Sequence, residues 1–257
     1  MPARASFDDL LADGASAPID GWDFSWFAGR ASEERTPWGY ARLLADRMAR
    51  ATTALDVQTG GGEVLAEALA RAPRAPRLLA ATEGWPPNLR TARDNLRRVG
   101  GHLVWAPDRG PLPFRDESFD LVVSRHPTVT GWDEVARVLG PGGTYLSQQV
   151  GAGSLRELTD ALMGPRPVGT GRSPERAVAA ARAAGLTVVD LREATLETAF
   201  HDVGAVVAFL RKVVWIVPGF TVEAYRQRLA ALHERIEIEG RFVAHAQRFL
   251  VEARKEL

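Results

Sequence analysis

The chain of 257 residues contains no cysteine. This absence excludes disulfide bonds, thiolate metal sites and cysteine nucleophiles. Lys plus Arg and Asp plus Glu number 32 each, so the formal net charge is zero and no basic excess attracts nucleic acid. No apolar run reaches the roughly 18 residues that a membrane span needs. The start Met1-Pro2-Ala3-Arg4 leads into acidic residues rather than an apolar signal core, so the sequence predicts a cytoplasmic protein.

Histidine is also scarce, with five in the chain. His102, His233 and His245 show no spacing with acidic residues that is typical of a metal site. The sequence therefore predicts no bound metal.

Strands and helices alternate after an N-terminal segment of residues 1–37. The predicted strands are near 53–57, 77–82, 102–106, 119–124, 143–150 and 186–191. The predicted helices are near 38–50, 63–71, 87–98, 132–139 and 173–184. This alternation indicates parallel βαβ units in a doubly wound α/β sheet that is covered on both faces.

The pattern changes after Leu191. Residues 202–214 and 221–239 are predicted helices, separated by Pro218-Gly219 and capped by Asp202 and Thr221. His201 beside Asp202 suggests a catalytic pair, but capping is the favoured interpretation because adjacent side chains need not face one another. Residues 242–254 fit a last sheet strand or a helix.

A glycine-rich turn joins the first predicted strand to its helix. The strand ends at Asp56, glycines follow at positions 60, 61 and 62, and a helical pattern begins at Glu63. Glycines let the backbone approach a ligand closely, and a helix N-terminus presents free N–H groups. The next strand ends at Glu83, where a carboxylate can accept hydrogen bonds from both hydroxyls of a ribose. These features indicate a nucleotide site, although such a turn can also simply connect two elements.

Five motifs in this order resemble the class I S-adenosylmethionine-dependent methyltransferases, especially their small-molecule branch. They are the acid and glycines of residues 56–62, the acid Glu83, the loop Pro107–Phe114 ending in Leu-Pro-Phe, the turn and strand Asp116–Val123, and the helix and Pro-Gly-Gly turn of Glu134–Gly143. The resemblance spans Trp38 to about Leu191.

The resemblance implies a fold and a cofactor. The fold would be a doubly wound, mostly parallel, seven-stranded-type sheet over residues 38–257, with a helical lid from residues 1–37 and an insertion at about 195–240. The cofactor would be S-adenosylmethionine, with S-adenosylhomocysteine as product. The implied cofactor-binding residues are Asp56, Gln58, Gly60, Gly62, Glu83, Gly84, Trp85, Asp108, Arg109 and Ser124.

Some of these residues carry more than one interpretation. Asp108 is expected to accept a hydrogen bond from the adenine amino group, with Arg109 supplying a backbone N–H nearby. Trp85 either stacks on the adenine or packs under the following helix. Asp56 orders backbone N–H groups of the turn or meets the cofactor's ammonium group through water. Gln58 stands where the family usually has glycine, which puts the standard cofactor pose in question.

The methyl acceptor would face the end of strand 119–124. His126 follows this strand and is the candidate catalytic residue, as a general base or simply as a wall or hydrogen-bond partner of the acceptor. The candidate acceptor-binding residues are Trp22, Trp26, Trp38, His126, Gln149 and Trp215. Most of the aromatic side chains outside the sheet pattern are expected to pack the added helices, and a few to line the pocket.

The predicted activity is methyl transfer to an oxygen or nitrogen of a small organic, ring-bearing or hydrophobic molecule. An RNA or protein methyltransferase is less favoured, because the neutral chain shows no basic track. A cofactor-binding protein without catalysis is the alternative prompted by Gln58. A nicotinamide dehydrogenase fits the glycines but not the Leu-Pro-Phe and Phe-Asp-Leu-Val-Val motifs. The expected partner is the small-molecule acceptor, without nucleic acid or membrane, and the protein would be a monomer or homodimer.

Overall fold

The computed structural model describes residues 5–19 and 22–257, so Met1–Arg4 and positions 20–21 of the N-terminal segment lie outside the described residues. The chain divides into two compact units. The sheet unit comprises Thr36–Ala152, Thr170–Ala194 and Arg248–Leu257. The helical unit comprises the chain before Thr36, Gly153–Gly169 and Thr195–Gln247.

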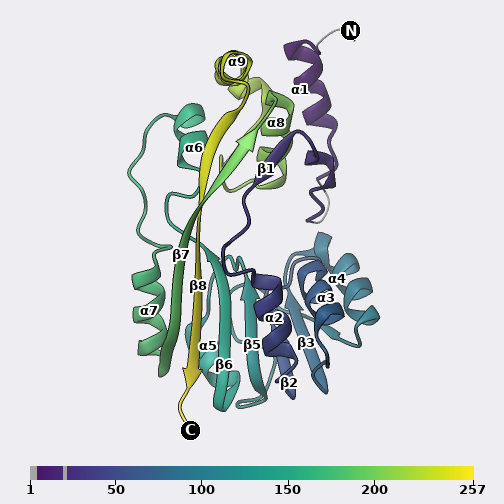
Figure 1. The fold of residues 1–257 in the computed structure, drawn as a ribbon, viewed down its shortest axis with the longest axis vertical. Coiled ribbons are helices and arrows are strands. Elements are labelled where there is room, and N and C mark those ends of the chain that lie inside the picture. The colour runs from purple at the N-terminus through teal and green to yellow at the C-terminus, as the bar shows by residue number, and fades with distance from the viewer. Residues whose placement is uncertain (1–4, 20–21) are drawn as a thin grey trace. The chain divides into compact units, whose positions relative to one another are not determined.

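The strands are β1 (Ala31–Glu33), β2 (Thr53–Asp56), β3 (Leu78–Glu83), β4 (His102–Trp105), β5 (Phe119–Arg125), β6 (Leu139–Val150), β7 (Leu186–Phe200) and β8 (Phe242–Lys255). In the described residues they form an eight-stranded sheet in the order β1-β7-β8-β6-β5-β2-β3-β4 (Figure 1). Strands β4, β3, β2, β5 and β6 pair in parallel with one another, in that order. On its other side, β6 pairs antiparallel with β8. The mostly parallel α/β sheet is therefore confirmed.

The strand count differs from the seven expected. The additional strand, β1, has only three residues, too few for a periodic pattern to reveal it. It pairs antiparallel with Thr198–Phe200 of β7. The sequence analysis ended that strand at Leu191, whereas β7 continues to Phe200. The ambiguous segment 242–254 is the strand β8.

Helices of the sheet unit agree closely with the predicted ranges. They are α2 (Tyr40–Met48), α3 (Glu63–Arg71), α4 (Pro86–Arg98), α5 (Trp132–Val138) and α7 (Pro174–Ala183). Figure 1 shows α2, α3 and α4 grouped beside β2 and β3. Helix α7 begins where the Ser173-Pro174 pair predicts, since the Ser173 hydroxyl accepts a hydrogen bond from the Arg176 N–H.

Successive residues of the central strands enter two different apolar clusters. Ala54 and Leu121 belong to the cluster that contains residues of α2, α3 and α4. Leu55 and Val122, one position further along each strand, belong to the cluster that contains residues of α5 and α7. Because neighbouring side chains of a strand point to opposite faces, both faces of the central sheet are covered by helices.

Arg137 of α5 holds the chain that carries the Leu-Pro-Phe motif. Its guanidinium donates to the backbone carbonyls of Leu112 and Phe114, each at 2.9 Å. It also pairs with Glu134 and Asp116, each at 2.7 Å. The motif before β5 and the motif of α5 therefore stabilise one another.

The helical unit contains α1 (Phe7–Ser16), the 3₁₀ turn Ser25–Phe27, α6 (Arg156–Met163), α8 (Val203–Lys212) and α9 (Val222–Glu239). The predicted caps are confirmed, because Asp202 accepts from the Ala205 N–H at 2.8 Å and Thr221 from the Ala224 N–H at 3.1 Å. Asp202 also accepts two hydrogen bonds from the Arg30 guanidinium. Helices α1 and α6 were not predicted from the sequence.

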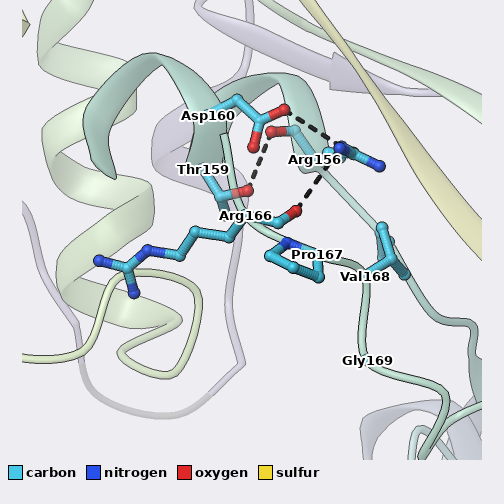
Figure 2. A pocket seen from close by; sticks show the side chains of 9 residues that line it. Arg156, Thr159, Asp160, Arg166, Pro167, Val168 and Gly169 are labelled. Atoms are coloured by element: carbon cyan, nitrogen blue, oxygen red, sulfur yellow. Dashed lines mark hydrogen bonds and ion pairs between the residues drawn. The ribbon is translucent and has the colours of Figure 1, made fainter. Parts of the chain in front are cut away.

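A pocket of the helical unit lies against α6 (Figure 2). It is lined by Gly153, Ser154, Arg156, Thr159, Asp160 and residues 166–169. Arg156 pairs with Asp160 at 3.1 Å and donates to the carbonyl of Arg166 at 3.5 Å. The Pro/Gly-rich loop after α6 is thereby tied back to the helix. None of the predicted site residues lines this pocket.

No helix in residues 5–19 and 22–257 is both long enough and apolar enough to span a bilayer. The longest, α9, carries charged residues along its length.

Helices α1 and α8 approach closely at two glycines. A methyl group on Gly14 would overlap the Gly204 carbonyl, and one on Gly204 would lie 2.5 Å from the Leu10 carbonyl oxygen. We therefore expect Gly14→Ala to destabilise the protein by about 2 kcal/mol, although alanine is the better helix former. Gly169→Ala is the control, since a methyl group there meets nothing within 4 Å. Denaturant unfolding would measure both, and equal midpoints would contradict the close approach.

Candidate functional site

The predicted cofactor residues meet at one edge of the sheet unit. Asp56 ends β2, Glu83 ends β3, and Asp108 follows β4. Ser124 and His126 lie at the end of β5. Since these strands are parallel neighbours, their carboxyl ends share one edge, which is where open α/β sheets bind ligands.

The carboxylate of Glu83 joins two turns at this edge. One oxygen accepts the Gly60 N–H at 2.8 Å and the other accepts the Trp85 N–H at 2.7 Å. The residue is 5% exposed, and this burial raises its pKa although the two N–H groups oppose the shift. Glu83 is therefore not an exposed acid at a strand end. The side chain of Asn88 also forms a hydrogen bond with this carboxylate, which has about four acceptor positions and so keeps room for a hydrogen bond from a ligand.

Asp56 lies at the base of the glycine turn and is also buried. Its Oδ2 accepts a hydrogen bond from the Thr59 hydroxyl at 2.7 Å. Burial raises the pKa of Asp56 to about 7, and the nearby charge of Glu83 contributes to the shift. The sequence analysis expected Asp56 to order backbone N–H groups. It did not identify Thr59, although a hydroxyl three residues after the acid was visible in the turn.

The turn itself takes left-handed backbone conformations at Gln58, Gly60 and Gly62, with φ of 59°, 65° and 75°. Glycine adopts such angles freely, whereas they cost a residue with a side chain roughly 1 kcal/mol. Gln58 thus occupies a conformation suited to the glycine that the family usually has there. Its backbone N–H donates to the Thr82 hydroxyl at 3.2 Å.

The side chain of Gln58 bridges to the loop after β5. Its Nε2 donates to the Val129 carbonyl at 2.7 Å, and its Oε1 accepts the Thr128 N–H at 2.7 Å. The Thr128 hydroxyl in turn donates to Asp108 at 2.6 Å. We call this connection of Gln58, Thr128 and Asp108 the Gln58 bridge. Thr128 and Val129 were missed because nothing in the sequence pairs these distant loops.

The remaining predicted cofactor residues are placed as follows. A methyl group on Gly84 would lie 2.6 Å from the Ala106 carbonyl oxygen, so glycine is required where the loops after β3 and β4 approach. Trp85 is 48% exposed, which does not fit a side chain packed under α4. Arg109 is exposed. The Ser124 hydroxyl is buried against Tyr145 at 2.7 Å, so its side chain serves the core.

His126 has a left-handed backbone, with φ of 55°, and its ring contacts Gln148. The two Nε2 atoms of His126 and Gln148 are 2.9 Å apart, and the His126 N–H donates to the Gln148 carbonyl at 2.7 Å. Burial and the positive charges of Arg125 and Arg248 lower the pKa of His126 well below 6.5. A ring that resists protonation is poorly suited to act as a general base.

The predicted acceptor residues fall in both units. Trp38 is buried in the sheet unit, where its indole N–H donates to Gln148 at 2.8 Å. Gln149 donates to the Thr130 hydroxyl at 3.2 Å. In the helical unit, Trp22 packs on Trp215, with ring centroids 5.7 Å apart. There the Arg30 guanidinium lies 3.9 Å from the Trp26 ring centroid. The acceptor-binding role of these residues stays a prediction. Gln148 was expected to contact substrate or solvent, and its hydrogen bonds to Trp38 and His126 were not predicted.

Metal ligands do not gather at this edge. Within the described residues, no three or more His, Asp or Glu side chains are grouped so that they could hold a metal ion.

The raised pKa of Asp56 predicts a pH-dependent stability. The unfolded chain loses this proton near pH 3.8, but the folded protein keeps it up to about pH 7. Folding stability therefore falls between these values as pH rises. Asn cannot ionise, so we expect Asp56→Asn to gain on the order of 2 kcal/mol relative to wild type between pH 5 and pH 8. Urea unfolding of both proteins at the two pH values measures this, and a constant difference would contradict the shift.

Residues 55–147 match the family model of a methyltransferase domain. No curated protein matches the sequence significantly. Among solved structures, a candidate methyltransferase from Bacillus halodurans has a TM-score of 0.59 and 19% identity, with 84% of this chain and 99% of that chain covered. A candidate sarcosine dimethylglycine methyltransferase from Galdieria sulphuraria has a TM-score of 0.53 and 14% identity, with 97% and 98% covered.

A geranyl diphosphate methyltransferase, solved with GPP and sinefungin, has a TM-score of 0.51 and 12% identity, with 84% of this chain and 77% of that chain covered. At these identities the structural likeness establishes the fold, and the family model adds the class of domain. The matched segment runs from the end of β2 through β5 and most of β6, and hence contains the glycine turn, Glu83 and Asp108. Residues 55–147 thus match a methyltransferase domain, and the chain has the fold of solved proteins described as methyltransferases.

Proposed function

We propose that the protein transfers the methyl group of S-adenosylmethionine to an oxygen or nitrogen of a small organic molecule and releases S-adenosylhomocysteine. The observation that carries the proposal is the buried Glu83 carboxylate, whose two oxygens are held at the sheet edge by the N–H groups of Gly60 and Trp85. Two adjacent acceptors of this kind suit the two hydroxyls of a ribose.

The other side chains at the edge fit the rest of the cofactor. Asp108 uses Oδ2 for Thr128, so Oδ1 remains for the adenine amino group. The half-exposed Trp85 offers a ring face to adenine. When bound, the cofactor supplies an electrophilic methyl group on a sulfonium, which needs an oriented nucleophile more than a base. The protein would therefore act chiefly by positioning the two molecules and excluding water.

A small, ring-bearing or hydrophobic acceptor is the substrate class that we favour. The neutral chain offers no excess of positive charge for nucleic acid. The relative solved with GPP gives an example of this fold with an organic ligand. We propose that residues 1–37 and the insertion at about 195–240 form a lid, with Trp22, Trp26 and Trp215 among the residues that select the acceptor.

Cofactor binding tests the role of Glu83. We expect wild type to bind S-adenosylmethionine and S-adenosylhomocysteine with micromolar affinity, and Glu83→Gln to weaken both by at least about tenfold (~1.4 kcal/mol), because an amide presents one acceptor instead of two. Glu67→Gln is the control, because Glu67 lies exposed on α3 and pairs with Arg71. Calorimetry measures all three proteins. Absence of binding to wild type, with or without candidate acceptors, would overturn the proposed function.

A second candidate, a cofactor-binding protein without catalysis, is favoured by the Gln58 bridge. The bridge closes one loop over another at the edge where the family binds its cofactor. Turnover on a panel of acceptors distinguishes the two, since tight binding without turnover supports the second candidate.

The same bridge predicts the behaviour of Gln58→Gly. Glycine suits the left-handed backbone and removes the hydrogen bonds that the Gln58 side chain makes to Thr128 and Val129. We expect S-adenosylmethionine to bind about threefold or more tightly, because binding no longer has to open the bridge. Thr128→Val removes the hydroxyl that contacts Asp108 and Gln58 but keeps the Thr128 N–H and Val129 carbonyl bonds of Gln58, so it should have a smaller effect. Weaker binding to Gln58→Gly in calorimetry would show instead that the amide contacts the cofactor.

A further inference from the structure

Three side chains of the sheet unit form a continuous hydrogen-bonded series. Trp38 precedes α2, Gln148 lies on β6, and His126 follows β5. The indole Nε1 of Trp38 is 2.8 Å from Oε1 of Gln148, and Nε2 of Gln148 is 2.9 Å from Nε2 of His126. Trp38 and Gln148 are each 3% exposed, so water does not compete for these bonds.

The direction of every bond in the series is fixed by the first residue. An indole N–H can only donate, so it must face the oxygen of the Gln148 amide. The Thr36 hydroxyl donates to the same oxygen at 3.3 Å and favours the same orientation. The amide NH₂ therefore faces His126 and donates, and Nε2 of His126 must accept with its lone pair. A neutral imidazole that accepts at Nε2 carries its proton on Nδ1.

The backbone holds the ring in this position. The backbone N–H of His126 donates to the backbone carbonyl of Gln148. The two residues are therefore joined through their main chains as well as through their side chains. The hydrogen bond that the structure gives to this ring within the described residues is made by Nε2. Arg125 and Arg248 are the charged groups that act on this ring, and both oppose a second proton.

We infer that Trp38 and Gln148 are positioning residues that lock His126 in the Nδ1–H tautomer, so that it presents a hydrogen-bond donor to the methyl acceptor and is not its base. The inference rests on the proposed function. The acceptor then carries an oxygen that receives this bond, such as that of a carbonyl or carboxylate. The acceptor atom that becomes methylated attacks with a lone pair that needs no prior deprotonation. Any proton that this atom releases after the transfer passes to water.

Nitrogen-15 NMR of histidine-labelled protein tests the tautomer without any ligand. We expect His126 to show a protonated Nδ1 and an unprotonated Nε2 throughout about pH 6 to pH 8, with the signals assigned by their loss in His126→Asn. In Gln148→Glu the carboxylate can only accept, so the proton should move to Nε2. Gln149→Glu, one position along β6, is the matched control and should leave the tautomer unchanged. A protonated Nε2 in wild type, or no change in Gln148→Glu, would overturn the inference.

Steady-state kinetics test the donor role once an acceptor is found. Asn tolerates the left-handed backbone at position 126 and carries an N–H donor, but it cannot take up a proton. We expect His126→Asn to retain kcat within about threefold, and His126→Ser, which places its donor too far away, to raise KM for the acceptor about tenfold. A general base would instead lose most of kcat in both variants. Failure of cofactor binding would overturn the proposed function while leaving the NMR result to stand alone.

Discussion

The buried carboxylate of Glu83 is the interaction on which the edge of the sheet depends. Removing a carboxylate from water is strongly unfavourable unless hydrogen bonds replace the lost solvent. Two backbone N–H groups do so here, one from the glycine turn and one from the start of α4. The same contact that makes the burial tolerable also fixes the two turns in relation to each other. The hydrogen bonds that stabilise the buried charge of Glu83 therefore also set the shape of this edge.

A second acid so close to Glu83 would repel it if both were fully ionised. Asp56 is buried and titrates near pH 7, so at neutral pH it is partly protonated. Thr59 donates its hydroxyl to this carboxyl group and ties it to the turn. The strained Gln58 then joins this arrangement to the loop after β5.

Much of the fold followed from local patterns. The parallel strands and the helices of the sheet unit were predicted because an apolar run or a helical periodicity marks each of them. Helix α6 was missed because it has eight residues and no side-chain cap. Strand β7 extends past Leu191 through Arg192 and Glu193, which are exposed charged residues that interrupt the apolar pattern of the strand.

The site residues likewise fall into those that a local pattern identifies and those that depend on distant parts of the chain. Asp56, Glu83 and Asp108 stand beside recognisable strand ends, so a short stretch of sequence identifies them. Gln148 and Thr128 gain their importance from the register of strands far apart in the chain, since Arg125 pairs with Gln148 across β5 and β6. No spacing along the sequence encodes that register. The hydrogen bond of Trp38 was not predicted for a related reason, because an aromatic residue before a helix gives no sign of the amide that it bonds.

The division of the chain into units has a consequence for how such a protein can be changed. The helical unit is assembled from three separate stretches, and both β7 and β8 begin in one unit and end in the other. Replacing any one continuous stretch with the corresponding stretch of a relative would therefore exchange only part of the helical unit. The register of β7 or β8 with its neighbouring strands would then no longer match. Because β7 and β8 run continuously through both units, the helical unit cannot be exchanged as one module. We expect it to diverge by substitution and by loop insertion.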